Sequence, residues 1–337
     1  MVTLGQIGVG YWGKNLLRNF VSLSNCQVKI CCDTDETILG RMNRDYAGLR
    51  WTQDYSDVLA DDEIQAIVIA TLPETHFIIA KEALLAGKDV FVEKPLVLNV
   101  SDGEELVQLA DAQKRILMVG HIMEYHPAVN QMKDLINKDE LGEIHYIYST
   151  RVNLGKIRRF ENALWNLAPH DVSIVLYLSD SVPIEIIAVG ESYLQKGIQD
   201  VTFATLRFRG GKMAHIHVSW LDPHKIRKIT VVGSKKMAVF DDMESTEMIR
   251  IYDKGVDQRL DYESYGESLS LRIGDIHIPK VNMTEPLRLE CQHFLDCVVN
   301  RTQPRSDGLD GLNVVKVLDA AQKSMERGGT PVRIEEE

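Results

Sequence analysis

Three glycines in the stretch TLGQIGVGYWGKN, at residues 3–15, have the spacing of a phosphate-binding turn. A short apolar strand runs into Gly8, Gly10 and Gly13, and apolar residues at helical spacing follow them. The first glycine permits the tight turn, the second lets a pyrophosphate approach the backbone, and the third lets helix and strand pack closely. We predict that this turn, with Tyr11 and Trp12 inside it, binds a dinucleotide.

An acidic residue stands at the end of the second expected strand, residues 28–32. Asp33 lies about 20 residues beyond Gly13, where a carboxylate is placed to accept hydrogen bonds from both hydroxyls of the adenosine ribose. A carboxylate there also repels a 2′-phosphate, and no arginine follows before Arg41. The sequence therefore favours NAD over NADP as the cofactor.

Two further stretches place polar residues where later strands should end. The segment TLPETH offers Thr71, Pro73 and His76 to the nicotinamide half of the cofactor, although ordinary turn chemistry explains His76 equally well. The segment EKP puts Glu93 and Lys94 at the tip of a buried strand, before a proline that is a candidate for a cis peptide bond. Burying a lysine at such a position costs free energy unless its charge is paired or used in catalysis, which favours a functional role.

A third stretch, LWNLAPHD at residues 164–171, centres on His170. Pro169 is typical of the first turn of a helix, so His170 is expected near a helix N-terminus, where the dipole lowers its pKa and keeps it neutral as a base. A lone histidine on a helix is usually structural. Asn166 one turn earlier and Asp171 beside it favour function here.

Composition excludes several classes of partner. The 337 residues carry 38 Lys and Arg against 49 Asp and Glu, a net charge of -11 that repels nucleic acid and anionic membranes. The five cysteines lack the spacing of a zinc site. His215 and His217 are better explained by the alternation of a strand than as ligands, so we predict no metal site.

The N-terminal sequence bears on localisation. The first expected strand begins within about five residues of Met1, leaving no room for a signal peptide, and no apolar run approaches the length of a membrane span. We therefore expect a soluble, cytoplasmic protein.

The order of elements predicts an α/β fold in two domains. Strands alternate with helices up to residue 121, which is typical of a Rossmann doubly wound parallel sheet that binds its ligand at the carboxyl ends of the strands. Residues 122–337 read as an α+β domain with an open, mostly antiparallel sheet, whose last helix could pack back on the first domain. One face of that sheet is left over for a partner subunit, so a homodimer or homotetramer is expected.

Several of these segments resemble those of the Gfo/Idh/MocA oxidoreductase family: GVGYWG, ATLPETH, EKPL, the helix with PHD, VVGSKKMAVFDD and SDGLDGLNVVKVLDAAQKS. The resemblance covers nearly the whole chain. It implies a Rossmann domain joined to an open antiparallel sheet domain, NAD(P), and a sugar or polyol substrate. It also implies dimers or tetramers formed through the free sheet face, and it places Lys94 and His170 at the reacting carbon.

Two departures from the common family pattern narrow the expected substrate. Asn166 replaces an aspartate four residues before the histidine, and an amide orients a hydroxyl but takes no proton. The segment GHIMEYHP, with Tyr125, stands where many members carry an arginine pair. Together with ENALW at residues 161–165 it resembles the branch that oxidises UDP-N-acetylglucosamine, or its uronate, at C3 before transamination.

We therefore expect an NAD-dependent dehydrogenase acting on a UDP-N-acetylamino sugar, with Lys94, His170 and Asn166 as its catalytic residues. Some members of that branch reoxidise bound NAD with 2-oxoglutarate. An inositol or free-sugar dehydrogenase, or a non-catalytic NAD-binding regulator, remains an alternative, and the sequence leaves open whether Lys94 or His170 is the base. The expected substrate-binding side chains also include those of Tyr125, Lys156, Arg158, Arg159 and Trp165; for the basic ones a solvated loop is as good an explanation.

Overall fold

The computed structural model describes residues 1–155, 157–258 and 269–334, which form two compact units. The first unit comprises Met1–Tyr125 and Thr284–Lys316, and the second comprises His126–Met283 and the chain from Val317 onward. This division differs from a single boundary after residue 121, because a C-terminal segment completes the core of the first unit.

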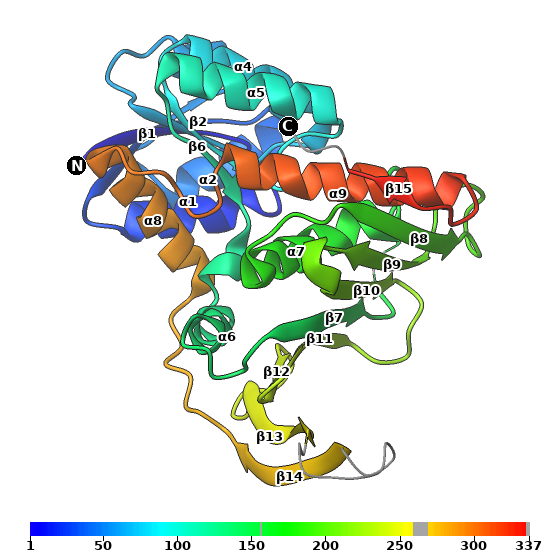
Figure 1. Ribbon diagram of the computed structural model, residues 1–337. Coiled ribbons are helices and arrows are strands. Elements are labelled where there is room, and N and C mark those ends of the chain that lie inside the picture. The colour runs from blue at the N-terminus through cyan, green and yellow to red at the C-terminus, as the bar shows by residue number, and fades with distance from the viewer. Residues whose placement is uncertain (156, 259–268, 335–337) are drawn as a thin grey trace. The chain divides into compact units, whose positions relative to one another are not determined.

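The first unit is built on a six-stranded parallel sheet in the order β3-β2-β1-β4-β5-β6 (Figure 1). Its strands are β1 (Val2–Ile7), β2 (Cys26–Cys32), β3 (Arg50–Thr52), β4 (Ala66–Ile69), β5 (Asp89–Glu93) and β6 (Leu117–Gly120). Its helices are α1 (Gly13–Ser22), α2 (Glu36–Asp45), α3 (Ser56–Leu59), η1 (Pro73–Thr75), α4 (His76–Leu85), α5 (Val100–Gln113), η2 (Ile122–Tyr125) and α8 (Pro286–Asn300). The predicted Rossmann sheet is confirmed.

Three phenylalanines explain why α8 belongs to this unit. Phe294 of α8 meets Phe20 of α1 and Phe91 of β5 edge to face, with ring centroids 6.3 and 5.6 Å apart. All three side chains are fully buried, and edge-to-face contacts add to the free energy that such burial supplies. The unit therefore lacks a closed core without residues that lie far along the sequence.

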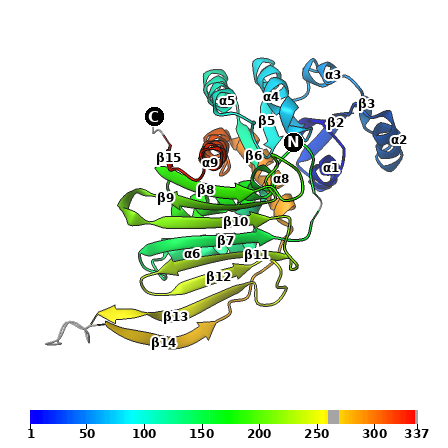
Figure 2. The ribbon, with the colours of Figure 1, turned by 90° about the vertical axis from the view of Figure 1, so that its right-hand side faces the viewer.

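The second unit is built on a nine-stranded sheet in the order β14-β13-β12-β11-β7-β10-β9-β8-β15 (Figure 2). Among the strands that the structure describes, only β7 and β10 of this sheet pair in parallel, so the sheet is mostly antiparallel as predicted. Its strands are β7 (Ile144–Val152), β8 (Glu185–Glu191), β9 (Val201–Arg207), β10 (Met213–Ser219), β11 (Ile226–Gly233), β12 (Met237–Asp241), β13 (Ile249–Gln258), β14 (Leu269–His277) and β15 (Val332–Arg333). Its helices are α6 (Pro127–Asn137), α7 (Ala163–Ser179) and the short η3 (Arg209–Gly211); α9 (Gly308–Glu326) begins in the first unit and ends in the second.

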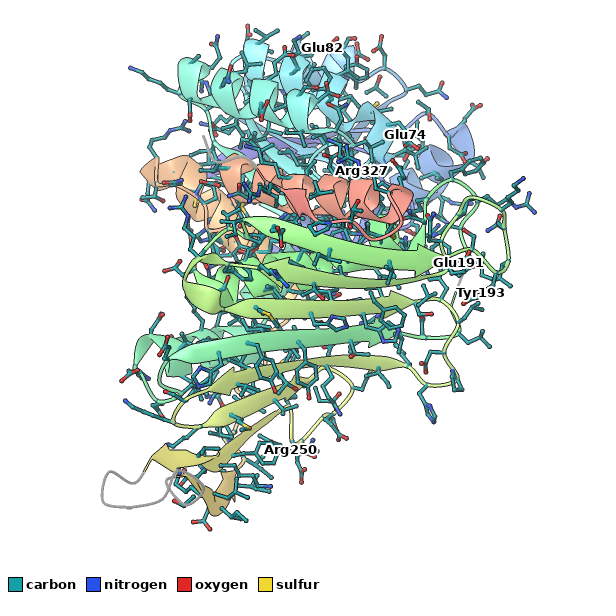
Figure 3. All side chains as sticks on the ribbon, turned by 45° about the vertical axis from the view of Figure 1, so that its right-hand side comes forward. Glu74, Glu82, Glu191, Tyr193, Arg250 and Arg327 are labelled. Carbon is teal, nitrogen blue, oxygen red and sulfur yellow. The ribbon has the colours of Figure 1, made fainter. Side chains whose placement is uncertain are left out.

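Helices α6 and α7 cover one face of this sheet, and Figure 2 shows the opposite face without a helix from the described residues. Tyr146, Tyr148 and Phe203 are 44%, 40% and 41% exposed on that face. Phe203 stacks on His217, with ring centroids 4.3 Å apart. In Figure 3 the side chains of this face project forward, with Arg250 of β13 among them.

Strands β13 and β14 were absent from the predicted elements. The segment LSLRI, at residues 269–273, alternates apolar and polar residues, which is the pattern of a strand with one apolar face. Leu271 and Ile273 are both 78% exposed, so the apolar face of β14 does not form part of the core. The alternation of these residues, rather than their apolar content, is the sequence pattern that could have indicated β14.

Candidate functional site

The glycine turn joins β1 to α1 with the geometry expected of a pyrophosphate cradle. Gly8 has a φ of +89°, and a Cβ there would lie 2.5 Å from the carbonyl oxygen of Ala70. A Cβ on Gly13 would lie 2.2 Å from the carbonyl oxygen of Gly8, so helix and turn touch through that missing side chain. Beside Gly10 a Cβ would meet no atom within 4 Å, which leaves the backbone open to a ligand.

Two side chains hold this turn in place. Gln6, buried on β1, donates from Nε2 to the carbonyl oxygens of Gly8 at 2.9 Å and Gly13 at 2.7 Å. Asp33 accepts from the backbone N–H groups of Val9 at 2.9 Å and Asp35 at 3.0 Å, one bond to each carboxylate oxygen. Each oxygen keeps a further lone pair for a ribose hydroxyl, so these residues fit NAD. Sequence reasoning missed Gln6, whose glutamine type gave no indication.

Trp12 connects the turn to the end of β5. Its indole Nε1 donates to Glu93 Oε1 at 2.5 Å, whereas Tyr11 is 87% exposed. The cofactor turn and the strand that carries Lys94 are therefore joined by a charge-assisted hydrogen bond when Glu93 is ionised.

Glu93 ends β5, and Lys94 follows it at the Lys94–Pro95 cis peptide bond. The carboxylate of Glu93 also accepts from the Lys94 backbone N–H at 3.2 Å. Burial raises the pKa of Glu93 to about 7, against the Trp12 hydrogen bond and the Lys94 charge, which lower it. Lys94 is half-buried, so a cation and a titrating acid lie together at the carboxyl end of β5, the strand next to the edge strand β6.

The segment between the end of β4 and the start of α4 carries Thr71 and Pro73, and His76 is the first residue of α4. Thr75 donates from its hydroxyl to that of Thr71 at 2.7 Å. The ring nitrogens of His76 lie 2.8 Å from the carbonyl oxygen of Pro95 and 3.3 Å from that of Thr71. Burial lowers the pKa of His76, so the ring is neutral and can donate to one of them at a time. His76 therefore contacts both the loop that carries Thr71 and the loop that carries Pro95. Its contact with the cofactor stays a prediction.

Tyr125 lies inside the first unit. Its hydroxyl is 3.0 Å from that of Ser306, and only 3% of the residue is exposed. Burial raises the pKa of Tyr125 well above its usual value. Ser306 is therefore a structural partner of Tyr125. The predicted contact between Tyr125 and the substrate stays a prediction.

In the second unit, the predicted helix start before His170 is wrong. Helix α7 begins at Ala163, after Asn162, whose side chain accepts from the Trp165 N–H at 3.0 Å. Pro169 lies within the helix rather than in its first turn. His170 therefore stands more than a turn from the N-terminus, where the dipole effect has largely faded. Asn162 caps the helix, and the sequence-based prediction missed it.

Asn166 is fixed from two sides. Its Nδ2 donates to Glu161 Oε1 at 2.6 Å, and its Oδ1 accepts from the Trp220 indole at 3.3 Å. Glu161 in turn lies 3.5 Å from Arg158 Nε. A carboxylate thus adjoins Asn166 even though the aspartate expected at that position is absent, and Glu161 was missed because it lies five residues earlier.

Asp171 points to the sheet. It accepts hydrogen bonds from Ser149 and from Arg151 Nε, the latter at 2.5 Å, and all three residues are buried. The ion pair ties α7 to β7. Asp171 thus supports the position of the helix that carries His170.

The remaining predicted substrate residues lie on the loop before α7. Arg158 and Arg159 are exposed and Trp165 is half-buried, while Lys156 lies outside the described residues. Within the described parts of the chain, no helix is long and apolar enough to cross a membrane.

Two family models match the chain. The model described as "Oxidoreductase family, NAD-binding Rossmann fold" matches residues 2–121, and the "GFO/IDH/MocA C-terminal domain" matches residues 129–239. The first match agrees with the cradle formed by Gly8, Gly10, Gly13 and Asp33, and the chain's cofactor is NAD.

Three known proteins are similar to this chain. The UDP-N-acetylglucosamine 3-dehydrogenase of Acidithiobacillus ferrooxidans is 26% identical over 194 residues, covering 57% of this chain and 60% of that protein. A solved structure under that name, from the same organism, has a TM-score of 0.80 at 21% identity and covers 96% of this chain and 97% of its own. The inositol 2-dehydrogenase of Salmonella typhimurium is 22% identical over 341 residues, covering 97% of this chain and 95% of that protein. A protein of gentamicin A biosynthesis, solved in complex with NAD, has a TM-score of 0.83 at 21% identity, covering 99% of this chain and 97% of its own.

The aligned segment of the 3-dehydrogenase spans less than two thirds of that relative, and at these identities the solved structures show a shared fold. The two family models together span most of the chain, from residue 2 to residue 239. The chain therefore belongs to the Gfo/Idh/MocA family of NAD-binding oxidoreductases.

Proposed function

We propose that this oxidoreductase oxidises the C3 hydroxyl of a UDP-N-acetylamino sugar, UDP-N-acetylglucosamine or its uronate, to a 3-keto sugar for later transamination. The observation that carries the proposal is Lys94, a half-buried cation at the end of β5 beside the NAD cradle, in a chain similar to a UDP-N-acetylglucosamine 3-dehydrogenase. A cation in that place stabilises an alkoxide as it develops.

Each residue has a stated task in this proposal. Bound NAD supplies the hydride acceptor. Lys94 or His170 takes the hydroxyl proton as general base, and the protonated Lys94 stabilises negative charge on the sugar oxygen. Asn166, with its orientation set by Glu161 and Trp220, orients the hydroxyl. Arg158 and Arg159 hold the diphosphate or the uronate carboxylate.

A substrate screen tests the proposal. Purified protein with NAD is offered UDP-N-acetylglucosamine, its uronate, inositol and free sugars, and NADH formation is followed by absorbance. Turnover of a UDP-sugar with little turnover of the free compounds is the expected result. Preference for inositol would replace the proposal with the second candidate, which is favoured by the longer alignment to inositol 2-dehydrogenase. Absence of turnover with every alcohol would favour a non-catalytic NAD-binding role.

The open face of the second sheet supports a homodimer or homotetramer as a second part of the proposal. Its exposed aromatic side chains, Tyr146, Tyr148 and Phe203, form an apolar surface of the kind that subunit interfaces cover. Light scattering of the wild-type protein and of Phe203→Glu measures the mass. A monomeric wild type would contradict this proposal.

Retention of NAD is a third part. The turn held by Gln6 and Asp33 is fixed before the ligand arrives, and such preorganised donors slow dissociation. We expect purified protein to carry NAD(H), and 2-oxoglutarate to raise product yield when NAD is substoichiometric. Denaturing the protein and measuring released nucleotide tests the first expectation. Product strictly stoichiometric with added NAD, whether or not 2-oxoglutarate is present, would contradict the second.

A further inference from the structure

Hydrogen bonds hold the chain on both sides of Lys94. Before the lysine, the side-chain carboxylate of Glu93 accepts from the Lys94 backbone N–H at 3.2 Å. After the lysine, the carbonyl oxygen of Pro95 lies 2.8 Å from Nδ1 of His76, a residue that is 1% exposed. The position of Lys94 is therefore set by the side chains of Glu93 and His76.

The carboxylate of Glu93 occupies a niche made by a glycine. Gly120 of β6 pairs with Glu93 of β5, and a Cβ on Gly120 would lie 3.1 Å from Cδ and from both carboxylate oxygens of Glu93. Only 9% of Glu93 is exposed. The absence of a side chain on Gly120 thus gives the carboxylate its place against β6, and the surrounding protein confines it there.

Trp12 reaches this niche from the cofactor turn. Its indole Nε1 donates to Glu93 Oε1 at 2.5 Å, although the two residues are 81 positions apart in the sequence. Because 38% of Trp12 is exposed, this hydrogen bond closes the niche on its solvent side. The indole therefore connects the turn that contains Gly8, Gly10 and Gly13 to the acid that fixes Lys94.

The two hydrogen bonds to Glu93 require its ionised form. A carboxylate accepts at both oxygens, whereas in a carboxylic acid the oxygen that carries the proton becomes a donor. Burial raises the pKa of Glu93 to about 7, against the Trp12 hydrogen bond and the Lys94 charge, which lower it. Glu93 consequently accepts from both Trp12 and Lys94 above this pH and loses one of the two bonds below it.

The other titratable groups that face Glu93 come from α8. Glu290 and Cys291 are both fully buried. Burial raises the pKa of each well above its usual value, and the nearby Glu93 charge adds to both shifts. Neither group therefore adds a negative charge to the niche at pH 7. The interactions that favour the ionised form of Glu93 are those with Trp12 and Lys94.

We propose that Trp12 is a positioning residue for the reaction, which holds Lys94 in place for the alcohol through its hydrogen bond to Glu93. The turn that binds NAD then also fixes the lysine. This inference rests on the proposed function, because it needs Lys94 to act on an alcohol, whichever alcohol that is. A misplacement of about 1 Å at a reacting group can cost about 100-fold in rate, so one charge-assisted hydrogen bond in this place matters.

The indole N–H of Trp12 reports the contact without any substrate. In protein labelled with ¹⁵N at its four tryptophans, the Trp12 signal is the one missing from Trp12→Phe. It should shift with pH around the pKa of Glu93, about 7, and Glu93→Gln should abolish this response. The Trp51 indole, which has no hydrogen-bond partner within the described chain, is the internal control. A Trp12 signal that stays constant from about pH 5 to pH 9 would overturn the inference.

Trp12→Phe tests the role in the reaction. Loss of a donor that lowers the pKa of Glu93 raises that pKa, so the acidic limb of kcat should move to higher pH. At pH 7 kcat should fall by about 10-fold because Lys94 is held less firmly, while KM for the alcohol should change by less than about twofold. Trp51→Phe removes an indole from β3 and is the matched control, which should behave as wild type.

Cofactor affinity distinguishes positioning from simple contact. Calorimetry gives the dissociation constant for NAD in wild type and in Trp12→Phe. If that constant rises while kcat at saturating NAD and its acidic limb stay as in wild type, Trp12 is only a cofactor contact and the inference is wrong. If Trp12→Phe fails to fold, Glu93→Gln replaces it: its amide faces one of the two N–H donors with another donor, so kcat should fall and the acidic limb should disappear. An unchanged limb in Glu93→Gln would contradict the inference.

The substrate screen separates this inference from the proposed function. If UDP-sugars are inactive and another alcohol turns over, Trp12→Phe is measured with that alcohol. A lower kcat and a shifted limb then support the role of Trp12 although the substrate assignment is wrong. If UDP-sugars turn over and Trp12→Phe matches wild type in both readouts, Trp12 does not position Lys94 and the proposed function stands.

Discussion

The site residues His76 and Glu93 of the first unit are buried and bonded to named partners, whereas the arginines on the loop before α7 in the second unit are exposed. His76 and Glu93 are 1% and 9% exposed, while Phe160 is 94% exposed between Arg159 and Glu161. Buried groups are held by the fold before any ligand arrives. Exposed groups gain their order from the ligand, at a cost in side-chain entropy. The cofactor chemistry is thus set by the fold, and substrate choice by side chains that substitution can change without disturbing the core.

The largest effect expected on the first unit's side of this comparison is that of Lys94→Ala. Removing a base or an alkoxide-stabilising cation should lower kcat/KM by about 10²–10⁴-fold. NAD affinity, measured by calorimetry, should change little because the cradle is built by other residues. Lys81→Ala is the control, since that lysine pairs at 2.6 Å with Glu105 between α4 and α5. Near-wild-type turnover in Lys94→Ala would remove Lys94 from the chemistry.

Gly13→Ala should have the next largest effect. A Cβ there would lie 2.2 Å from the Gly8 carbonyl oxygen, so the turn must shift and the dissociation constant for NAD should rise by about 10-fold or more. Gly40→Ala in α2 is the matched control, because a Cβ at Gly40 meets no atom within 4 Å. That control should raise the free energy of unfolding by roughly 0.5–1 kcal/mol and leave NAD affinity unchanged. Equal NAD affinity in both variants would show that close packing at Gly13 is not needed.

The two arginines of the exposed loop, Arg158 and Arg159, test the second unit's side of this comparison. Arg158 lies 3.5 Å from Glu161, which partly neutralises it, whereas Arg159 has no ion pair within the described residues. Arg159→Ala should therefore raise KM for the UDP-sugar by about 10-fold, with a smaller rise for Arg158→Ala. Thermal unfolding of both variants should match wild type, because both side chains are exposed. A larger effect from Arg158→Ala would reverse the assignment.

The sequence predicted the first unit better than the second. The glycine spacing, the acid at Asp33 and the buried strands are local patterns, and they predicted the parallel sheet and its cofactor turn. Phe294 packs on Phe20 and Phe91 from far along the chain, so no local pattern marks it, and the residue type of Gln6 does not indicate its hydrogen bonds to the turn. The helix start was wrongly predicted near Pro169 from the proline alone, and the Asn162 cap was missed.

The smallest expected effect concerns Asn166→Asp, which restores the aspartate of the common family pattern. Asn166 Nδ2 lies 2.6 Å from Glu161 Oε1, so a carboxylate there would face another carboxylate at hydrogen-bond distance. One of the two must then hold a proton, and their pKa values separate, as in any close acid pair. We expect kcat near pH 7 to fall by about threefold, since at this pH the shared proton disturbs the orientation of the substrate hydroxyl.

The double variant Asn166→Asp with Glu161→Gln restores one donor and one acceptor in exchanged places, and should recover most of the lost rate. A double-mutant cycle on kcat measures that coupling, with Glu161→Gln alone as the third corner. Strictly additive effects would show that the Glu161–Asn166 contact does not position the substrate hydroxyl, and that the second unit relies on His170 without this support.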